Sequence, residues 1–204
     1  MHNSFLKLYI EINEINFIFF VGESDDQENF RILYELPIPL EGIEDNRITD
    51  LKKFFKTIKD NIYLIEQKYN HTFKELNLIL ENFNPTFINL TGFKKLNGSQ
   101  ILRENITYIL NTLKVYVDKT EEKKKILHIF NSRFLLDRKK IENPPIGLFG
   151  DFYSHELSFS LIDKNDYKNL KYIFDKSNLK IKKILFKSFV KGAYTSKTNS
   201  ETDS

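Results

Sequence analysis

Residues 6–21 read LKLYIEINEINFIFFV, and this stretch decides the class of fold. Two runs of apolar, β-branched and aromatic residues, 6–12 and 15–21, flank the polar dipeptide Asn13-Glu14. Such runs form strands, and a short polar break between them indicates a tight turn, because Asn tolerates the left-handed backbone that many hairpin turns use. The sequence therefore predicts an antiparallel β-hairpin at residues 6–21.

The segments that follow this hairpin predict further strands and helices. Residues 31–40 indicate a third strand, ended by Pro37 and Pro39, and residues 75–80 and 181–186 indicate two more. Residues 167–174 show the spacing of an amphipathic helix that stops near Asn178. A longer helix precedes residue 75, since apolar residues recur there at intervals of three and four. They are Ile48, Leu51, Phe54, Phe55, Ile58, Ile62, Ile65 and Tyr69.

A second set of strand and helix patterns begins after Asn82. Residues 87–95 alternate as a strand that ends at the turn signal Asn97-Gly98, residues 102–117 have helical spacing, and residues 126–136 and 152–162 indicate two strands. The charged stretch 118–125 is interpreted as a solvated connection. We therefore expect residues 1–82 with 163–194 to form one domain, residues 83–162 a second, inserted domain, and the polar residues 195–204 a flexible tail.

Composition excludes several classes of function. The net charge of the 204 residues is only +3, which argues against a nucleic-acid-binding protein. The chain has no cysteine for a disulfide or thiolate zinc site, and its four histidines share no metal-ligand spacing. No apolar run approaches the roughly 18 residues that span a bilayer, and no export signal is visible. These features predict a cytoplasmic protein that inserts into no membrane itself.

A constellation in residues 126–150 carries a family resemblance. ILHIFN at 126–131, FLLD at 134–137, Asn143-Pro144, Ile146-Gly147 and Gly150 follow one another in an order and spacing similar to the bacterial cell-division protein family FtsA. The signature residues are His128, Asp137, Asn143, Pro144, Gly147 and Gly150. The resemblance implies an α/β fold: a ribonuclease-H-like, actin-type lobe with an inserted strand-helix-strand-strand (SHS2) subdomain, from the N-terminal part of such a protein.

The resemblance also aligns Glu11, Asn13 and Glu14 with the phosphate loop of actin-like ATPases. That family has an Asp-apolar-Gly-Thr/Ser motif there, whose backbone amides approach phosphate and whose carboxylate organises Mg²⁺. Asn13 replaces the glycine, and Glu14 replaces the hydroxyl residue with an anion. Two unit charges of the same sign about 4 Å apart repel by about 1 to 4 kcal/mol, so Glu14 would weaken phosphate binding. Glu14 is alternatively an exposed turn residue that contacts no ligand. We expect no enzyme and no cofactor in this chain, and assign ATP with Mg²⁺ only to the full-length parent.

The implied function is that of a cell-division scaffold. In the FtsA family the parent links FtsZ filaments to the cytoplasmic face of the inner membrane at the division site. For this chain the resemblance implies self-association and binding of other division proteins through residues 83–162, where an exposed sheet edge would pair with a partner strand. Three alternatives remain: the nucleotide-binding lobe of an actin-like ATPase, half of a sugar-kinase-like enzyme, and a scaffold of pilus assembly similar to PilM.

Overall fold

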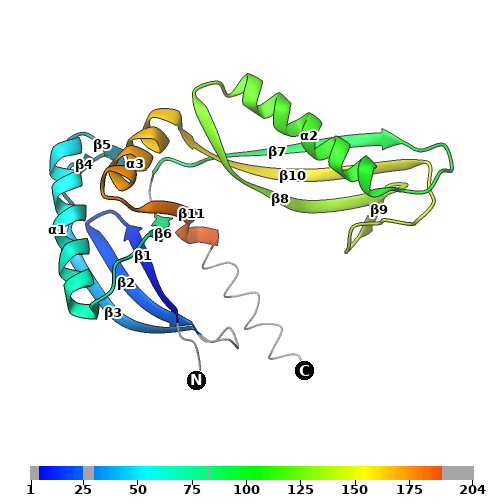
Figure 1. Ribbon diagram of the computed structural model, residues 1–204. Helices are drawn as coiled ribbons and strands as arrows, with labels where there is room; N and C mark the ends of the chain where they lie inside the picture. Colours follow the sequence, from blue (N-terminus) through cyan, green and yellow to red (C-terminus); the bar gives the residue numbers. More distant parts are fainter. Residues whose placement is uncertain (1–4, 25–29, 82, 190–204) are drawn as a thin grey trace. The chain divides into compact units, whose positions relative to one another are not determined.

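The computed structural model describes residues 5–24, 30–81 and 83–189 (Figure 1). The chain divides into two compact units, one formed by the residues up to Asn84 and from Asn165 onward, the other by Pro85–Lys164. Each unit has its own sheet and its own helical layer. The predicted mixed α/β class is confirmed.

The first unit is built on a five-stranded sheet in the order β11-β6-β1-β2-β3. The predicted hairpin forms its centre, with β1 antiparallel to β2 and β2 antiparallel to β3. β6 and β11 run parallel to β1, so that three neighbouring strands end at the same edge of the sheet. The strands are β1 (Phe5–Ile12), β2 (Asn16–Ser24), β3 (Phe30–Pro39), β6 (Glu75–Leu80) and β11 (Lys180–Phe186).

Apolar side chains on one face of this sheet are buried by α1 (Leu51–Tyr69) and α3 (Lys164–Lys176). The ring of Phe54 in α1 stacks on Phe17 of β2, with centroids 5.1 Å apart, and meets Phe174 of α3 edge-on. All three rings are fully buried. α1 begins where the Asp50 carboxylate accepts two backbone N–H groups and ends at Asn70, which has left-handed backbone. A short hairpin, β4 (Ile43–Glu44) and β5 (Arg47–Ile48), precedes it.

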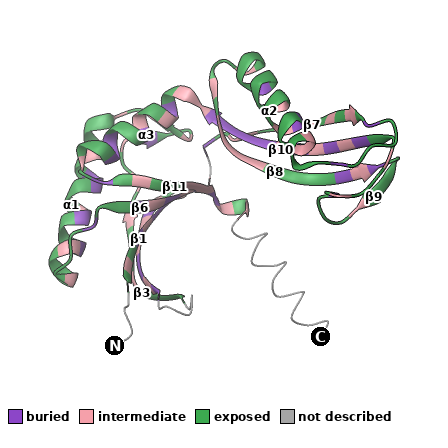
Figure 2. Ribbon diagram, turned by 45° about the vertical axis from the view of Figure 1, so that its right-hand side comes forward, coloured by how far each residue is buried: buried purple, intermediate pink, exposed green. Residues whose placement is uncertain are grey.

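The second unit is an antiparallel sheet in the order β7-β10-β8-β9 with one helix on it. The strands are β7 (Thr86–Lys95), β8 (Lys124–Leu136), β9 (Lys139–Ile141) and β10 (Phe152–Asp163), and the helix is α2 (Arg103–Thr120). α2 approaches β7 closely at Gly92, where a Cβ would lie 2.4 Å from Ile109. β10 lies between β7 and β8, and alternate residues from Tyr153 to Leu161 are buried (Figure 2).

β3 matches the predicted strand at residues 31–40 to within one residue and ends at Pro39, and it accommodates Pro37 because an edge strand needs no N–H donor on its outer side. Other predicted element ends are wrong. α2 continues to Thr120 and β8 starts at Lys124, so the charged connection is much shorter than residues 118–125. β9 was not predicted. The tail at 195–204 lies outside the described residues. In the described part of the chain, no helix is long and apolar enough to cross a membrane.

Candidate functional site

The turn between β1 and β2 is closed by the side chain of Asn13. Its Oδ1 accepts hydrogen bonds from the backbone N–H of Ile15, at 3.0 Å, and of Asn16, at 2.7 Å. The backbone N–H of Asn13 in turn donates to the carbonyl of Asn16 at 3.1 Å. The predicted hairpin is confirmed, but Asn13 does not adopt the left-handed backbone that was expected of it. Its side chain stabilises the turn instead, by accepting hydrogen bonds from nearby backbone N–H groups.

Three charged residues meet where β1, β6 and β11 end. Glu11 is the penultimate residue of β1, Glu81 follows β6, and Lys187 follows β11. The Lys187 ammonium donates to the Glu11 carboxylate at 2.7 Å and to the Glu81 carboxylate at 3.0 Å. The carboxyl ends of parallel strands are where open α/β sheets commonly bind ligands. The sheet topology therefore brings this ion cluster to the edge at which a ligand of the fold would be expected.

The cluster is partly shielded from water. The side chain of Glu11 is only 9% exposed, and those of Lys187 and Glu81 are 26% and 30% exposed. Burial by itself lowers the pKa of the Lys187 ammonium, but the hydrogen bonds and charges of Glu11 and Glu81 outweigh it, and the pKa of Lys187 is raised. Lys187 is therefore charged at neutral pH and neutralises one of the two carboxylates.

These residues do not fit a metal–nucleotide complex. The amides of Ile15 and Asn16, which would face phosphate oxygens, already donate to Asn13. The Glu11 carboxylate, which would organise the metal, is held by Lys187. Glu14 is exposed in the turn and adds a negative charge there. Over residues 5–24, 30–81 and 83–189, no group of three or more His, Cys, Asp and Glu residues is placed to hold a metal ion.

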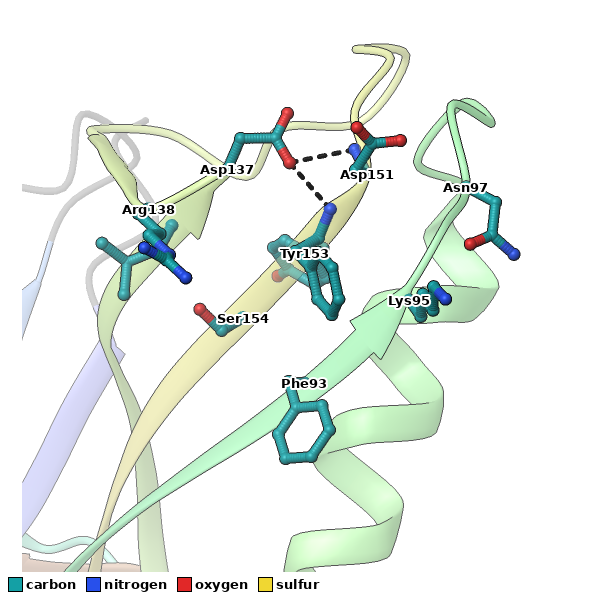
Figure 3. A pocket seen from close by; sticks show the side chains of 10 residues that line it. Phe93, Lys95, Asn97, Asp137, Arg138, Asp151, Tyr153 and Ser154 are labelled. Carbon is teal, nitrogen blue, oxygen red and sulfur yellow. Dashed lines mark hydrogen bonds between the residues drawn. The ribbon is translucent and has the colours of Figure 1, made fainter.

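A second candidate site lies in the second unit, at the end of the sheet where β7 stops and β10 starts. A hollow of about 620 Å³ opens there on the sheet (Figure 3). Its apolar lining includes Phe93, Leu135 and Phe152, and its charged lining includes Lys95 and Arg138. Apolar area beside a few charged groups is the usual make-up of a surface that recognises a peptide or small ligand.

Asp137 fixes the backbone on one side of this hollow. It lies in the turn between β8 and β9 with φ +49°, and its Oδ1 accepts from the backbone N–H groups of Asp151, at 2.9 Å, and Phe152, at 2.7 Å (Figure 3). Gly150 lies so close that a Cβ would be 2.4 Å from a methyl group of Leu136. Asp137 therefore holds the start of β10, and Gly150 lets the chain just before β10 pass close to Leu136.

The other signature residues are distributed over two places. Gly147, with φ +89°, donates its N–H to the carbonyl of Ile101 and accepts from the Gln100 side chain, which ties its loop to the segment before α2. Asn143 and Pro144 are exposed in the same loop. His128 lies nine residues before Asp137 on β8, opposite Ser160. The structure thus gathers Asp137, Gly147 and Gly150 at one end of the sheet and leaves His128 apart from them.

Sequence reasoning missed Glu81 and Lys187. Each is the first charged residue after a strand whose last residue, Leu80 or Phe186, is buried. That position was a usable signal, since charged residues that directly follow parallel strands meet at one edge. Phe93 and Phe152 were not predicted as site residues either, although both are aromatic residues near the end of a predicted strand.

Comparisons with known proteins find the fold but no family. No family model and no curated protein matches the sequence. The structure is similar to the PilM-PilN type IV pilus biogenesis complex, with a TM-score of 0.58 and 8% identity over 90% of this chain and 48% of that chain. It also matches a protein from Bacteroides thetaiotaomicron with actin-like ATPase fold and unknown function, with a TM-score of 0.39 and 12% identity over 95% of this chain and 56% of that chain.

The chain spans about half the length of the solved structures that it matches. The likeness to the PilM-PilN complex shows a shared fold over 90% of this chain. At such low identity the likeness shows the fold alone, and it does not distinguish the division proteins from the pilus scaffolds.

Proposed function

We propose that this chain is part of an actin-like scaffold that works by binding other proteins through the sheet of its second unit. The observation that carries the proposal is the face of that sheet on which, in the part of the chain that the structure describes, aromatic side chains are exposed. α2 packs against Gly92 and Tyr153, whereas the other face presents Phe93, 74% exposed, and Phe152, 50% exposed. Phe93 pairs with Ser154 and Phe152 with Lys95, so alternation along the strands places both rings on this one face.

The edge of the same sheet supports this proposal. β7 is the terminal strand of the sheet, and in the described part of the chain it pairs with β10 alone. An edge strand offers backbone donors and acceptors to an incoming strand, and side-chain pockets beside it supply specificity. The Phe93 ring lies in the hollow beside this edge. The fitting partner is an extended peptide with apolar side chains at alternate positions, one of which covers Phe93.

The charged side chains of the hollow bear on which charged groups the peptide would carry. Lys95 and Arg138 line the hollow, together with Asp137 and Asp151. The Asp137 carboxylate already accepts two backbone N–H groups, so its charge is partly satisfied within the chain. The lining therefore carries two charges of each sign, and an acidic group on the peptide would suit it only beside Lys95 and Arg138 and away from Asp151.

Two kinds of assembly fit such a scaffold. The order of residues 126–150 supports an FtsA-type scaffold, whose parent would link FtsZ filaments to the inner membrane on its cytoplasmic side and would self-associate. In that reading the second unit is the SHS2 subdomain, since its elements run β7, α2, β8 and β10, with β9 added. The likeness to the PilM-PilN complex supports a pilus-assembly scaffold equally. In both cases membrane attachment would belong to other parts of the assembly.

The test is a binding assay on the full chain with cytoplasmic tail peptides of division proteins and of PilN-type proteins. Fluorescence anisotropy should show binding to tails of one assembly. The double variant Phe93→Ser, Phe152→Ser should weaken it at least about tenfold, because buried aromatic anchors dominate such interfaces. The matched control is Tyr63→Ser, Tyr172→Ser, which removes two exposed aromatic rings from α1 and α3 and should leave the affinity unchanged.

Two results would refute the proposal. One is that the chain binds none of these tails and remains monomeric in sedimentation experiments. The other is that the Phe and Tyr double variants weaken binding equally. An ATPase lobe is the competing function, and tight binding and turnover of ATP with Mg²⁺ by the full-length parent would favour it.

A further inference from the structure

At the ends of β1, β6 and β11, an ammonium group lies between two carboxylates, as a bound metal ion would. Here the positive charge belongs to the chain itself. We propose that Lys187 and Asn13 replace a metal–nucleotide complex at this edge. The Lys187 ammonium takes the place of a divalent cation between Glu11 and Glu81, and the Asn13 side-chain oxygen takes the place of a phosphate oxygen at the turn amides. This inference concerns the first unit and goes beyond the binding function proposed for the second.

The cation position is defined by two carboxylates that share one ammonium. Oxygens of Glu11 and Glu81 lie 2.7 Å and 3.0 Å from the same Lys187 nitrogen. The two carboxylates are therefore near enough to repel each other strongly if the ammonium is removed. Two carboxylates at this separation are also the oxygen ligands that hard divalent cations prefer. Lys187 supplies a positive charge at the position that such a cation would take.

The anion position is defined by the two amides of the β1–β2 turn. Ile15 and Asn16 direct their N–H groups at one oxygen, and successive N–H groups of this kind form a common anion-binding arrangement in turns. Here the oxygen is that of Asn13, two and three residues earlier in the same turn. An external phosphate would have to displace it first.

The ion pair between Lys187 and Glu11 also connects distant parts of the chain. Lys187 and Glu11 are 176 residues apart in sequence, so their ion pair fixes the backbone after β11 to the first hairpin. The positive charge is covalently attached, and its occupancy does not depend on the concentration of any ligand. The first unit therefore keeps this edge ordered without nucleotide.

The test compares Lys187→Met with Lys182→Met. Lys182 lies in β11, five residues before Lys187, and pairs with Glu75, but both side chains are about half exposed. Exposed ion pairs contribute little, whereas removing one partner of a shielded pair leaves an uncompensated charge. By circular dichroism, Lys187→Met should lower Tm by at least about 5 °C, and Lys182→Met by less than about 2 °C.

Manganese then probes the vacated position. Mn²⁺ at about ten times its Kd should raise the Tm of Lys187→Met by about 3 °C, because the metal binds the folded form only. It should leave the wild type and Lys182→Met unchanged. Titration calorimetry of ATP with Mg²⁺ into the wild type should show no binding.

Further variants keep the inference testable if Lys187→Met does not fold. Lys187→Arg retains the positive charge and should keep Tm near the wild-type value. Glu11→Gln with Lys187→Met removes one charge of each sign, so it should be more stable than Lys187→Met alone. The inference is overturned if the wild type binds Mn²⁺ or ATP with Mg²⁺, if both lysine variants lose the same stability, or if the double variant is no better than Lys187→Met. None of these readouts needs a partner protein. The stability and Mn²⁺ results leave the proposed binding function untouched, whereas binding of ATP with Mg²⁺ would also favour the competing ATPase lobe.

Discussion

Replacing Asp137 tests how the start of β10 is held beside the hollow. One oxygen of its carboxylate accepts two backbone N–H groups, from Asp151 and Phe152, at 2.9 Å and 2.7 Å. Asp137 also has left-handed backbone, with φ +49°, which Asp and Asn adopt more readily than Ala. Asp137→Ala removes both contributions, whereas Asp137→Asn keeps the backbone preference and a neutral acceptor.

The expected loss in the free energy of unfolding follows from the hydrogen bonds and the backbone preference of Asp137. Hydrogen bonds to charged groups contribute about 1.5 to 3 kcal/mol each when buried, and the exposure of Asp137 brings the pair down to about 2 kcal/mol. Left-handed backbone at Ala adds about 1 kcal/mol. We expect Asp137→Ala to lower the free energy of unfolding by about 3 kcal/mol and Asp137→Asn by about 1 kcal/mol.

Urea denaturation followed by tyrosine fluorescence measures both values, since the chain has ten Tyr and no Trp. Asp151→Ala is the matched control: it removes a neighbouring exposed carboxylate, and its effect should stay within about 0.5 kcal/mol. The reasoning is refuted if Asp137→Ala is as stable as the wild type, or if the Ala and Asn variants are equally destabilised.

Two further predictions concern the core of the second unit. Gly92→Ala should lower the free energy of unfolding by about 1 to 3 kcal/mol in urea denaturation, because a Cβ there lies 2.4 Å from the buried Ile109, and an unchanged value would contradict the close approach of α2. His155 is fully buried, and burial lowers its pKa, so the unfolded chain binds a proton that the folded chain resists. The contribution of His155 to stability is therefore complete above pH of about 6.5 and is lost as the pH falls further, and His155→Phe should flatten this part of the stability–pH profile.

Local sequence patterns predicted the larger elements of the fold well. Apolar spacing predicts the helix that the structure places at Leu51–Tyr69, although Ile48, the first residue of that pattern, lies in β5 instead. Asn97-Gly98 forms the expected turn with both residues at positive φ. β9 has only three residues, too few for any periodicity to appear. β3 tolerates Pro37 because it lies at the sheet edge, a position that no local pattern reveals.

The candidate sites were predicted less completely, since their geometry depends on pairing between distant strands. The family resemblance aligns Glu11 and Asn13 with a phosphate loop, but the group that holds Glu11 lies 176 residues away and no local pattern indicates it. The parallel pairing of β1, β6 and β11 alone brings Lys187 to Glu11. In the second unit, the Phe93 and Phe152 rings share a face only because β7 and β10 pair in one particular register.

The difference between an attached and a diffusible charge decides how the first unit behaves in a cell. A lobe that binds ATP gains stability as RT ln(1 + [L]/Kd), so its order follows the nucleotide concentration. If Lys187 replaces the cation as proposed, this dependence on nucleotide concentration would disappear, because the ammonium bonded to Glu11 and Glu81 is part of the chain. In the proposed scaffold, the occupancy of the β7 edge would then depend on the concentration and sequence of the partner peptide and not on the nucleotide.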